Sequence, residues 1–174
     1  MSLRLNLGAG GQRAPGWTSV DRAGDVDVLL DIANDPWPWS KASTDGIVMH
    51  HLLDLLAVNE IDRVLRRCHE VLKPGGLLRI SCADLYVGVE AALAGDLDWF
   101  PEPRATMAET VGWFLTQGQA RRTVLDYERM ENMLTFAGFG YFLDDDANTM
   151  IAEAWIFDLD SRQGESWFMN AMRS

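Results

Sequence analysis

The pattern that most restricts the fold is a strand, a helix and a second strand in direct succession. Gly46 to His50 is a short apolar run, and residues 59–72 carry apolar side chains at the spacing of one helix face. Lys73-Pro74-Gly75-Gly76 is expected to end that helix and turn the chain. Residues 77–81 form a mostly apolar run with Leu77, Leu78 and Ile80, as in a strand buried on both faces. This unit predicts an α/β fold with a parallel sheet and right-handed crossovers.

Three shorter strands are expected before this unit. The first, residues 3–7, runs into Gly8-Ala9-Gly10-Gly11, and the second, residues 17–20, follows the breaker Pro15-Gly16. A third, residues 26–30, ends at Asp31. Only about nine residues separate the first two strands, whereas a parallel crossover usually needs roughly ten to twelve. The sequence therefore predicts a truncated first helix of at most one turn.

The second half of the chain follows a looser pattern. The expected elements are one or two helices over 86–123, a helix over 125–137 ending at Gly138, and two final strands over 139–143 and 167–172. Residues 151–159 fit a strand or a helix equally well. A chain of 174 residues fits one domain with one core. The single domain 1–174 would then have three parts, namely 3–85, 86–123 and 124–174.

Charge and composition disfavour several classes of function. The formal net charge of −11 argues against non-specific binding to nucleic acid, which depends on Lys and Arg against phosphates. No apolar run approaches the roughly 18 residues of a membrane span, and no signal peptide is evident. Two cysteines without a CxxC pair and three histidines without ligand spacing predict neither a disulfide framework nor a metal site. These features fit a cytoplasmic protein, and they leave the oligomeric state unknown.

A glycine loop at the end of a first strand lets a ligand approach the backbone closely. The dinucleotide pattern G-x-G-x-x-G fails here because Arg13 stands at its third glycine, and no Gly-Lys-Ser/Thr completes a phosphate loop. Asp21 follows the second strand, where a carboxylate reaches the ribose of a nucleotide held at the first loop. Asp31, after the third strand, faces the same edge and could accept a hydrogen bond from an adenine amino group. The alternative is that both aspartates form caps or turns.

Four pieces of the chain together resemble predicted S-adenosylmethionine-dependent methyltransferases. The pieces are LNLGAG at 5–10, PGWTSVD at 15–21, DGIV at 45–48 and VLKPGGLLRIS at 71–81. The most similar group is the short bacterial one with an LNLGCG…PGWxNVD opening, within the type 11 set. The resemblance covers about residues 3–85. It implies a Rossmann-like class I fold, with a seven-stranded, mostly parallel sheet whose last strand is antiparallel.

The resemblance also implies where S-adenosylmethionine would bind and where S-adenosylhomocysteine would remain as product. Carried over by position, Gly8, Ala9 and Gly10 would contact the methionine part, Asp21 the ribose, Asp31 and Ile32 the adenine, and Met49 and His50 would lie near the methyl group. Residues 3–85 would be the cofactor-binding half, and 86–123 a helical lid or substrate-covering insert. Trp99, Phe100, Trp113 and Phe114 in that insert could line an acceptor pocket or simply pack the lid.

Candidate general bases are His51, Asp84 and Tyr86, all expected near the carboxyl edge of the sheet. His51 is favoured because its unperturbed pKa lies near neutrality, and a helix-start or packing role is its alternative.

Some positions depart from the family pattern. Asp54 and Leu55 stand where the family often has Glu and His, and Arg121-Arg122 stand where a histidine is common.

Three hypotheses follow. The favoured one is a methyltransferase acting on a small-molecule or glycan-like acceptor. The second is a non-catalytic binding module that keeps the methyltransferase fold. The third, another Rossmann-like binder such as an NAD enzyme, is disfavoured by the missing third glycine and the short gap to Asp21.

Overall fold

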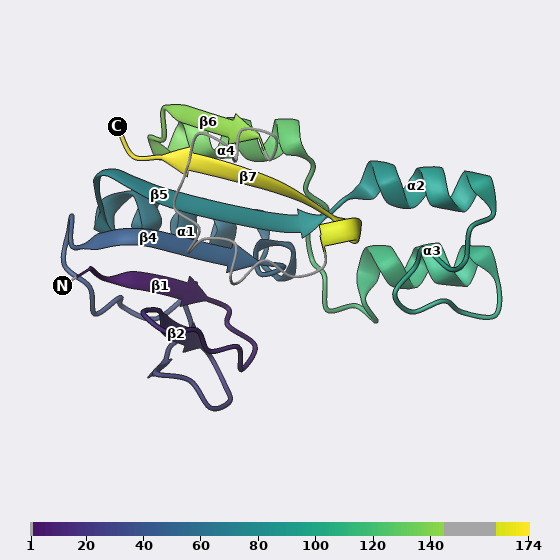
Figure 1. Ribbon diagram of the computed structural model, residues 1–174, viewed down its shortest axis with the longest axis horizontal. Coiled ribbons are helices and arrows are strands. Elements are labelled where there is room, and N and C mark those ends of the chain that lie inside the picture. The colour runs from purple at the N-terminus through teal and green to yellow at the C-terminus, as the bar shows by residue number, and fades with distance from the viewer. Residues whose placement is uncertain (1, 145–162) are drawn as a thin grey trace.

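The computed structural model describes residues 2–144 and 163–174, and it contains a seven-stranded sheet of order β3-β2-β1-β4-β5-β7-β6 (Figure 1). The strands are β1 (Arg4–Leu7), β2 (Thr18–Asp21), β3 (Val28–Leu29), β4 (Thr44–His50), β5 (Leu72–Ala83), β6 (Tyr141–Asp144) and β7 (Ser166–Met172). β7 pairs antiparallel with β5 and β6, and the pairs from β3 to β5 are parallel. The Rossmann-like sheet with an antiparallel last strand, expected from the sequence, is confirmed. The undecided segment 151–159 lies outside the described residues.

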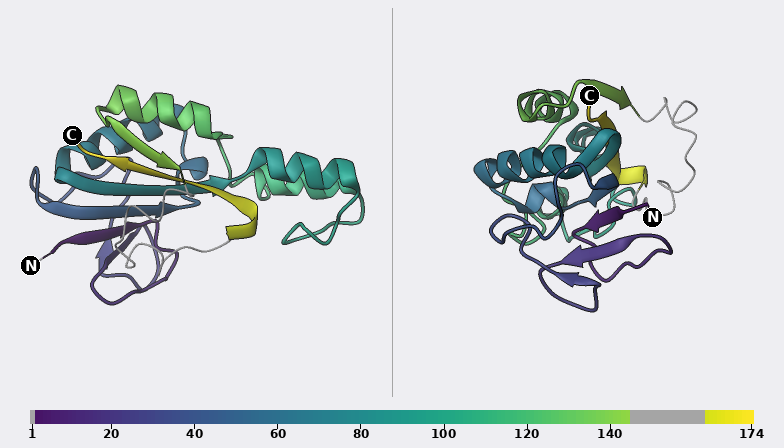
Figure 2. Two further views of the ribbon diagram at one scale, coloured as in Figure 1. Left: turned by 45° about the horizontal axis from the view of Figure 1, so that its top comes forward. Right: turned by 90° about the vertical axis from the view of Figure 1, so that its left-hand side faces the viewer.

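The helices take two different positions relative to the sheet. They are α1 (Val58–Val71), α2 (Leu85–Ala94), α3 (Met107–Thr116) and α4 (Tyr127–Ala137), with short 3-10 turns η1 (Leu53–Leu55) and η4 (Gln163–Glu165). α1 and α4 pack together on one face of the sheet (Figure 2), whereas α2 and α3 form a hairpin that projects beyond the carboxyl end of β5 (Figure 1). Most of the expected helical insert 86–123 therefore extends away from the sheet.

The connection between β1 and β2 contains turns and no helix. Gly8, Gly10, Gly11 and Gly16 all have positive φ, between 56° and 84°. Such backbone is strained for residues with a Cβ, so the glycines set the path of this loop. The predicted truncation of the first helix is thus confirmed, and residues 8–17 do not form even the one helical turn that the sequence allows.

Helix α1 forms as its apolar spacing predicts. Its start is fixed by Glu60, whose carboxylate accepts the Ala57 amide at 2.7 Å. The helix buries one stripe against the sheet and α4, made of Ile61, Val64, Leu65, Cys68 and Val71. The helix ends at Val71, and residues 73–76, where a turn is expected, form a bulge within the bounds of β5. Leu72 pairs with Thr44 and Leu77 with Gly46, so the four residues between them stand against one residue of β4, and Gly75 has a φ of 75°.

The α2–α3 hairpin has a small core of its own. Ala91, Phe100 and Phe114 are buried there, and the Trp99 ring lies edge-on to both phenylalanine rings. Gly88 permits this close packing, since a Cβ at that position would lie 2.6 Å from Phe114 Cε1. Trp99, Phe100 and Phe114 therefore pack the hairpin itself, whereas the Trp113 ring lies under the Arg104 guanidinium, 3.9 Å from Cζ to the ring centroid.

Asp45 ties together the starts of β1, β4 and β5. Its Oδ2 accepts the Leu3 amide at 2.7 Å, and its Oδ1 accepts from Lys73 Nζ at 2.6 Å. The Lys73 bond, followed by the Leu3 bond, holds the pKa of the Asp45 carboxyl below its ordinary value of 3.8 despite partial burial.

Asp45→Asn is expected to lower the free energy of unfolding at neutral pH, with the difference from the wild type shrinking as the pH falls below the ordinary pKa of an aspartate and through the lower pKa of the folded state. Because the folded-state pKa is depressed, the carboxylate stabilises the fold above the unfolded-state pKa. That contribution is lost as the pH falls through the folded-state pKa. Urea unfolding of both proteins across this range checks the prediction. Lys73→Met should reproduce most of the effect, and a difference that persists unchanged at low pH would contradict it.

Candidate functional site

A cavity of about 750 Å³ opens at the carboxyl edge of β1, β2 and β4. Its walls come from the glycine loop, the ends of the three strands, the segments that follow β3 and β4, and the segment after α3. The lining residues include Gly8, Ala9, Gly10, Asp21, Asp31, Ile32, His50, His51, Leu52, Glu60, Gln117 and Arg122. Ligands of open α/β sheets bind at this edge, where the strand order reverses. Here the reversal falls between β1 and β4.

The glycine loop is folded back onto β2. The Gly8 and Ala9 amides donate to the Val20 carbonyl at 2.8 and 3.1 Å. The Gly10 amide donates to Asp21 Oδ2 at 2.9 Å. A Cβ added at Gly10 would meet nothing within 4 Å, whereas one at Gly8 would lie 2.7 Å from Leu52 Cδ1. The loop therefore presents bare backbone to the cavity at Gly10 and is backed by Leu52 at Gly8.

The two acidic residues at the cavity also organise their own segments. Asp21 Oδ1 accepts the Arg22 amide at 2.7 Å, while its other oxygen holds Gly10. Asp31 accepts from the Asn34 side chain and from the Ala33 and Asn34 amides, at 2.9 to 3.2 Å. These bonds, the Asn34 side chain first, lower the pKa of the Asp31 carboxyl. Both aspartates thus form turns and line the cavity at the same time.

The two histidines after β4 are each fixed by a serine of a neighbouring segment. His50 Nδ1 lies 2.7 Å from Ser81 Oγ on β5, and His51 Nε2 lies 2.7 Å from Ser166 Oγ on β7. His51 has a φ of 48°, a left-handed conformation that its position at the strand exit imposes. Both rings line the cavity and are held in set orientations.

Two residues expected at the site lie elsewhere. Met49 is fully buried in the main core and does not line the cavity, because successive strand residues face opposite sides and His50 takes the cavity side. Asp84 caps α2, with its Oδ1 accepting the Tyr86 and Val87 amides, and it is not among the cavity-lining residues. Tyr86 is 66% exposed on the hairpin.

The segment after α3 is the part of the site that sequence reasoning missed. Gln117, Ala120 and Arg122 line the cavity, and Arg122 Nη1 lies 2.6 Å from Glu60 Oε2. These contacts join residues 62 or more positions apart. No local pattern of the sequence announces such contacts, although Arg121-Arg122 was noted as a departure from the family.

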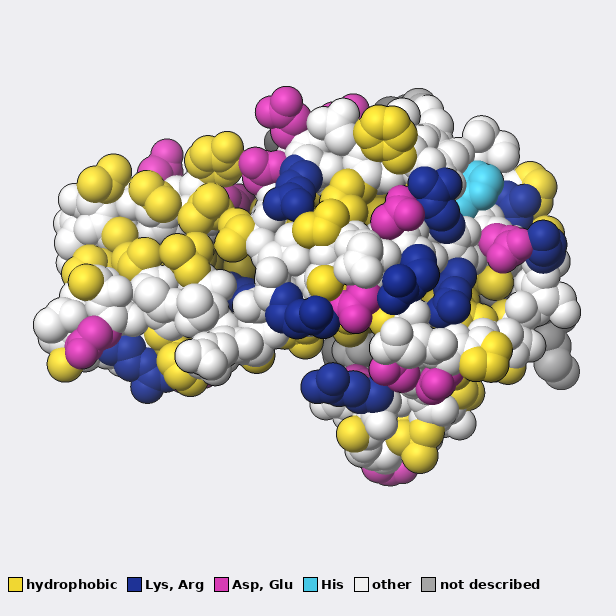
Figure 3. Space-filling model, turned by 180° about the vertical axis from the view of Figure 1, so that it is seen from behind, with side chains coloured by type: hydrophobic (Ala, Val, Ile, Leu, Met, Phe, Trp, Pro, Cys, Tyr) yellow, Lys and Arg dark blue, Asp and Glu magenta, His cyan; other side chains and the backbone are white. Residues whose placement is uncertain are grey.

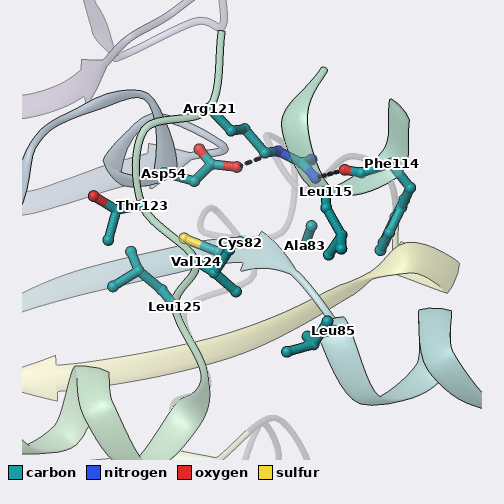
Figure 4. Close-up of a pocket in the computed structure, with 10 residues that line it drawn as sticks. All are labelled: Asp54, Cys82, Ala83, Leu85, Phe114, Leu115, Arg121, Thr123, Val124 and Leu125. Carbon is teal, nitrogen blue, oxygen red and sulfur yellow. Dashed lines mark hydrogen bonds and ion pairs between the residues drawn. The ribbon is translucent and has the colours of Figure 1, made fainter. Parts of the chain in front are cut away.

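Two departures from the family pattern meet in the structure. Asp54 and Arg121 form an ion pair of 2.7 Å with side chains only 4% and 5% exposed. Figure 4 shows this pair beside a small cavity of about 20 Å³ that is also lined by Cys82 and Thr123. Burial, followed by the Asp54 charge, raises the pKa of the Cys82 thiol well above its ordinary value. Cys82 is therefore a packed neutral thiol.

Across residues 2–144 and 163–174, the structure holds no group of His, Cys, Asp and Glu arranged to bind a metal ion. In the same ranges no helix has the length and hydropathy to cross a membrane.

Comparison with known proteins agrees with this geometry. Residues 13–80 match a family model described as a methyltransferase domain. No curated protein matches the sequence.

Among solved structures, a SAM-dependent methyltransferase from Archaeoglobus fulgidus is 12% identical with a TM-score of 0.61, and the match covers 98% of this chain and 86% of that one. A SAM-dependent methyltransferase from Thermotoga maritima, described as a possible histamine N-methyltransferase, is 14% identical with a TM-score of 0.61, covering 100% and 83%. Phosphoethanolamine N-methyltransferase 2 from Haemonchus contortus, solved with S-adenosyl-L-methionine, is 13% identical with a TM-score of 0.57, covering 99% and 48%.

The chain spans between 46% and 61% of several other similar structures, so those proteins contain further segments. It resembles class I S-adenosylmethionine-dependent methyltransferases in sequence over residues 13–80 and in fold over its length.

Proposed function

We propose that this protein is a methyltransferase that binds S-adenosylmethionine in the cavity at the carboxyl edge and transfers its methyl group to a small molecule. The observation that carries the proposal is the contact between Asp21 and Gly10, 2.9 Å long, inside that cavity. A carboxylate that would accept from ribose hydroxyls therefore lies directly beside exposed glycine backbone. Gly10 lies in the loop after β1, and Asp21 ends the neighbouring parallel strand β2.

The residues present fit the cofactor. Asp21 would accept from the ribose, Asp31 and Ile32 would flank the adenine, and Gly8 to Gly10 would receive the methionine part. The cofactor supplies an activated methyl group on a positively charged sulfur. The contribution of the protein is to align that group with the acceptor nucleophile, which supplies roughly 7–11 kcal/mol.

NAD fits less well. Arg13, at the place of the third glycine, carries a side chain that pairs with Asp25 and Asp27 at 2.9 and 2.8 Å. The close packing of a helix against the first strand, which that glycine permits in dinucleotide folds, is not available here. No helix follows the glycine loop to direct its N-terminus at phosphates.

A general base would add about 10²–10⁴-fold to transfer onto a hydroxyl or amine. His51 remains the candidate for this role, and His50 joins it, because both rings line the cavity. Asp84 is a weaker candidate, since its carboxylate caps α2. The serine bonds engage one ring nitrogen of each histidine, Nδ1 of His50 and Nε2 of His51, and so orient the two rings.

A small acceptor is supported by the cavity and the charge. A volume of about 750 Å³ lies within the usual range for small-molecule sites, and the net charge of −11 disfavours nucleic acid. Two of the similar structures are described as methyltransferases of small amines, one of them as a possible histamine enzyme. A non-catalytic binding module is the second candidate, favoured by Leu55 in place of the family's second histidine.

Calorimetric titration with S-adenosylmethionine, S-adenosylhomocysteine and NAD tests the proposal. We expect both sulfur compounds to bind and NAD not to bind. Failure of both to bind would overturn the proposed function. Transfer of a labelled methyl group to a panel of small amines, hydroxy compounds and sugars then separates the enzyme from the binding module, which would bind the cofactor without turnover.

A further inference from the structure

A buried ion pair just outside the main cavity joins two of its walls. Arg121 Nε lies 2.7 Å from Asp54 Oδ2, and both side chains are almost fully buried. The same guanidinium donates to the Phe114 carbonyl near the end of α3 and lies over the Phe114 ring, with 5.5 Å between Cζ and the ring centroid. Figure 4 shows Arg121 reaching between Asp54 and the α3 hairpin helix.

Backbone hydrogen bonds run alongside the ion pair. The amides of Arg122 and Thr123 donate to the Asp54 carbonyl at 2.8 and 3.1 Å. Thr123 Oγ1 donates to the Leu56 carbonyl at 2.6 Å. Residues 121–123 are thereby fastened to η1, the turn that follows β4. The segment after α3 and the turn after β4 form one connected unit.

Both segments of this unit line the cavity. Leu52, just before η1, packs on the glycine loop, because a Cβ at Gly8 would lie 2.7 Å from Leu52 Cδ1. Leu52 also lines the cavity, and so do Gln117 and Arg122 from the segment after α3. Asp54 is thus linked through its own chain to Leu52, and through Arg121 to the segment after α3 and to the hairpin.

We propose that Asp54 and Arg121 are positioning residues that couple the α2–α3 hairpin to the cofactor loop. Neither residue lines the main cavity. If the two buried side chains separate, each charge is left without compensation, which costs free energy. The pair therefore strongly prefers the arrangement in which the two charges are in contact. The hairpin and η1 therefore move together, and Leu52 holds its place on Gly8 only while the pair is intact. That the ligand is S-adenosylmethionine or its product rests on the proposed function. The coupling between the hairpin and the glycine loop does not depend on which ligand binds.

The test removes both charges at once, in the double variant Asp54→Leu with Arg121→Met. Losing both partners avoids a stranded buried charge, so this variant should remain folded. In the ligand-free double variant, we expect the backbone amides of residues 8–12 and 52–57 to exchange hydrogen about tenfold faster than in the ligand-free wild type, because these segments open more often. Exchange in β5 and β7 should be unchanged. Affinity for S-adenosylhomocysteine should fall about tenfold, within the usual range for coupled sites.

Two matched variants separate positioning from general stability. Asp62→Asn with Arg66→Gln removes an exposed ion pair of 3.0 Å on α1, away from the cavity, and should change neither exchange at 8–12 nor affinity. Arg121→Lys keeps the charge, although lysine lacks the guanidinium fork. The affinity of this variant for S-adenosylhomocysteine should stay within about threefold of the wild type, because most of the electrostatic pairing remains.

The outcomes are distinct. Wild-type exchange at residues 8–12 in the double variant would overturn the inference, and so would faster exchange spread equally over β5 and β7. If the wild type binds no S-adenosylhomocysteine, the proposed function fails, and the exchange comparison alone still decides whether the pair positions the loop.

Discussion

Replacing Asp21 with alanine is expected to weaken binding of S-adenosylhomocysteine by about tenfold or more, the size of one lost charge-assisted pair. The alanine variant loses two contributions to ligand binding that the Asp21 side chain makes. Its Oδ2 holds the Gly10 amide at 2.9 Å, so the variant loosens the glycine loop. Its carboxylate would also accept from the ribose hydroxyls. Calorimetric titration of the variant against the wild type measures the loss directly.

The more conservative Asp21→Asn divides these two contributions. An amide oxygen can still accept from Gly10 but carries no charge, so we expect an affinity between those of the wild type and the alanine variant. Asp25→Ala serves as the control, because its 96% exposed side chain pairs with Arg13 and does not line the cavity. Unchanged affinity in the alanine variant would remove Asp21 from the cofactor site.

Replacing Gly8 with alanine is the second change with a large expected effect. Gly8 has a φ of 72°, which costs a residue with a Cβ about 1–2 kcal/mol. The added Cβ would also lie 2.7 Å from Leu52 Cδ1, so Leu52 must leave its place on the loop. We expect a lower free energy of unfolding together with weaker binding of S-adenosylhomocysteine, measured by urea unfolding and calorimetry.

Gly24→Ala isolates the backbone strain from the displacement of Leu52. Gly24 has a φ of 94°, and a Cβ there meets nothing within 4 Å. It lies in the turn after β2 and away from the cavity. This variant should lose a similar amount of stability and keep its affinity for the cofactor product. Equal affinity in the Gly8 and Gly24 variants would show that the Leu52 contact has no role in binding.

The exposed apolar side chains of the hairpin are a separate feature of the surface. Figure 3 shows hydrophobic side chains gathered on the projecting lobe, where Tyr86, Val87, Val89 and Leu93 of α2 are exposed. Nearly all residues of α2 are apolar, and its one charged residue is Glu90. The buried side of α2 packs on α3 through Gly88, so the hairpin itself is held from within.

The local parts of the site could be predicted because short-range chemistry determines them. The strand, the glycine loop and Asp21 lie within a stretch of the chain that forms two adjacent parallel strands. Parallel neighbours bring their carboxyl ends to the same edge, so Asp21 reaches Gly10 without help from distant residues. The helical stripe of α1 is equally local, because its spacing alone selects the buried face.

Other residues could not be placed from the sequence, because their positions depend on the side of the sheet or on where a helix begins. Met49 and His50 are neighbours, but strand alternation sends only His50 to the cavity. Asp84 follows β5, as expected for a carboxyl-edge residue, yet α2 begins directly after it and takes its carboxylate as a cap. Whether residues 86–123 cover the site likewise depends on the direction in which α2 leaves the sheet, and no apolar pattern in the sequence encodes that direction.

The sequence by itself determined that this chain forms a Rossmann-like sheet with a glycine loop, an adjacent acidic residue and at most one turn of a first helix. Those features depend on glycine conformations, apolar spacing and neighbouring strands. Only the tertiary structure decided that the segment after α3 lines the cavity, fastened by Arg121 to Asp54. The physical reason is distance along the chain: that pair joins two loops whose sequences carry no periodicity, and its burial arises only when the segment after α3 packs against η1 and the end of β5.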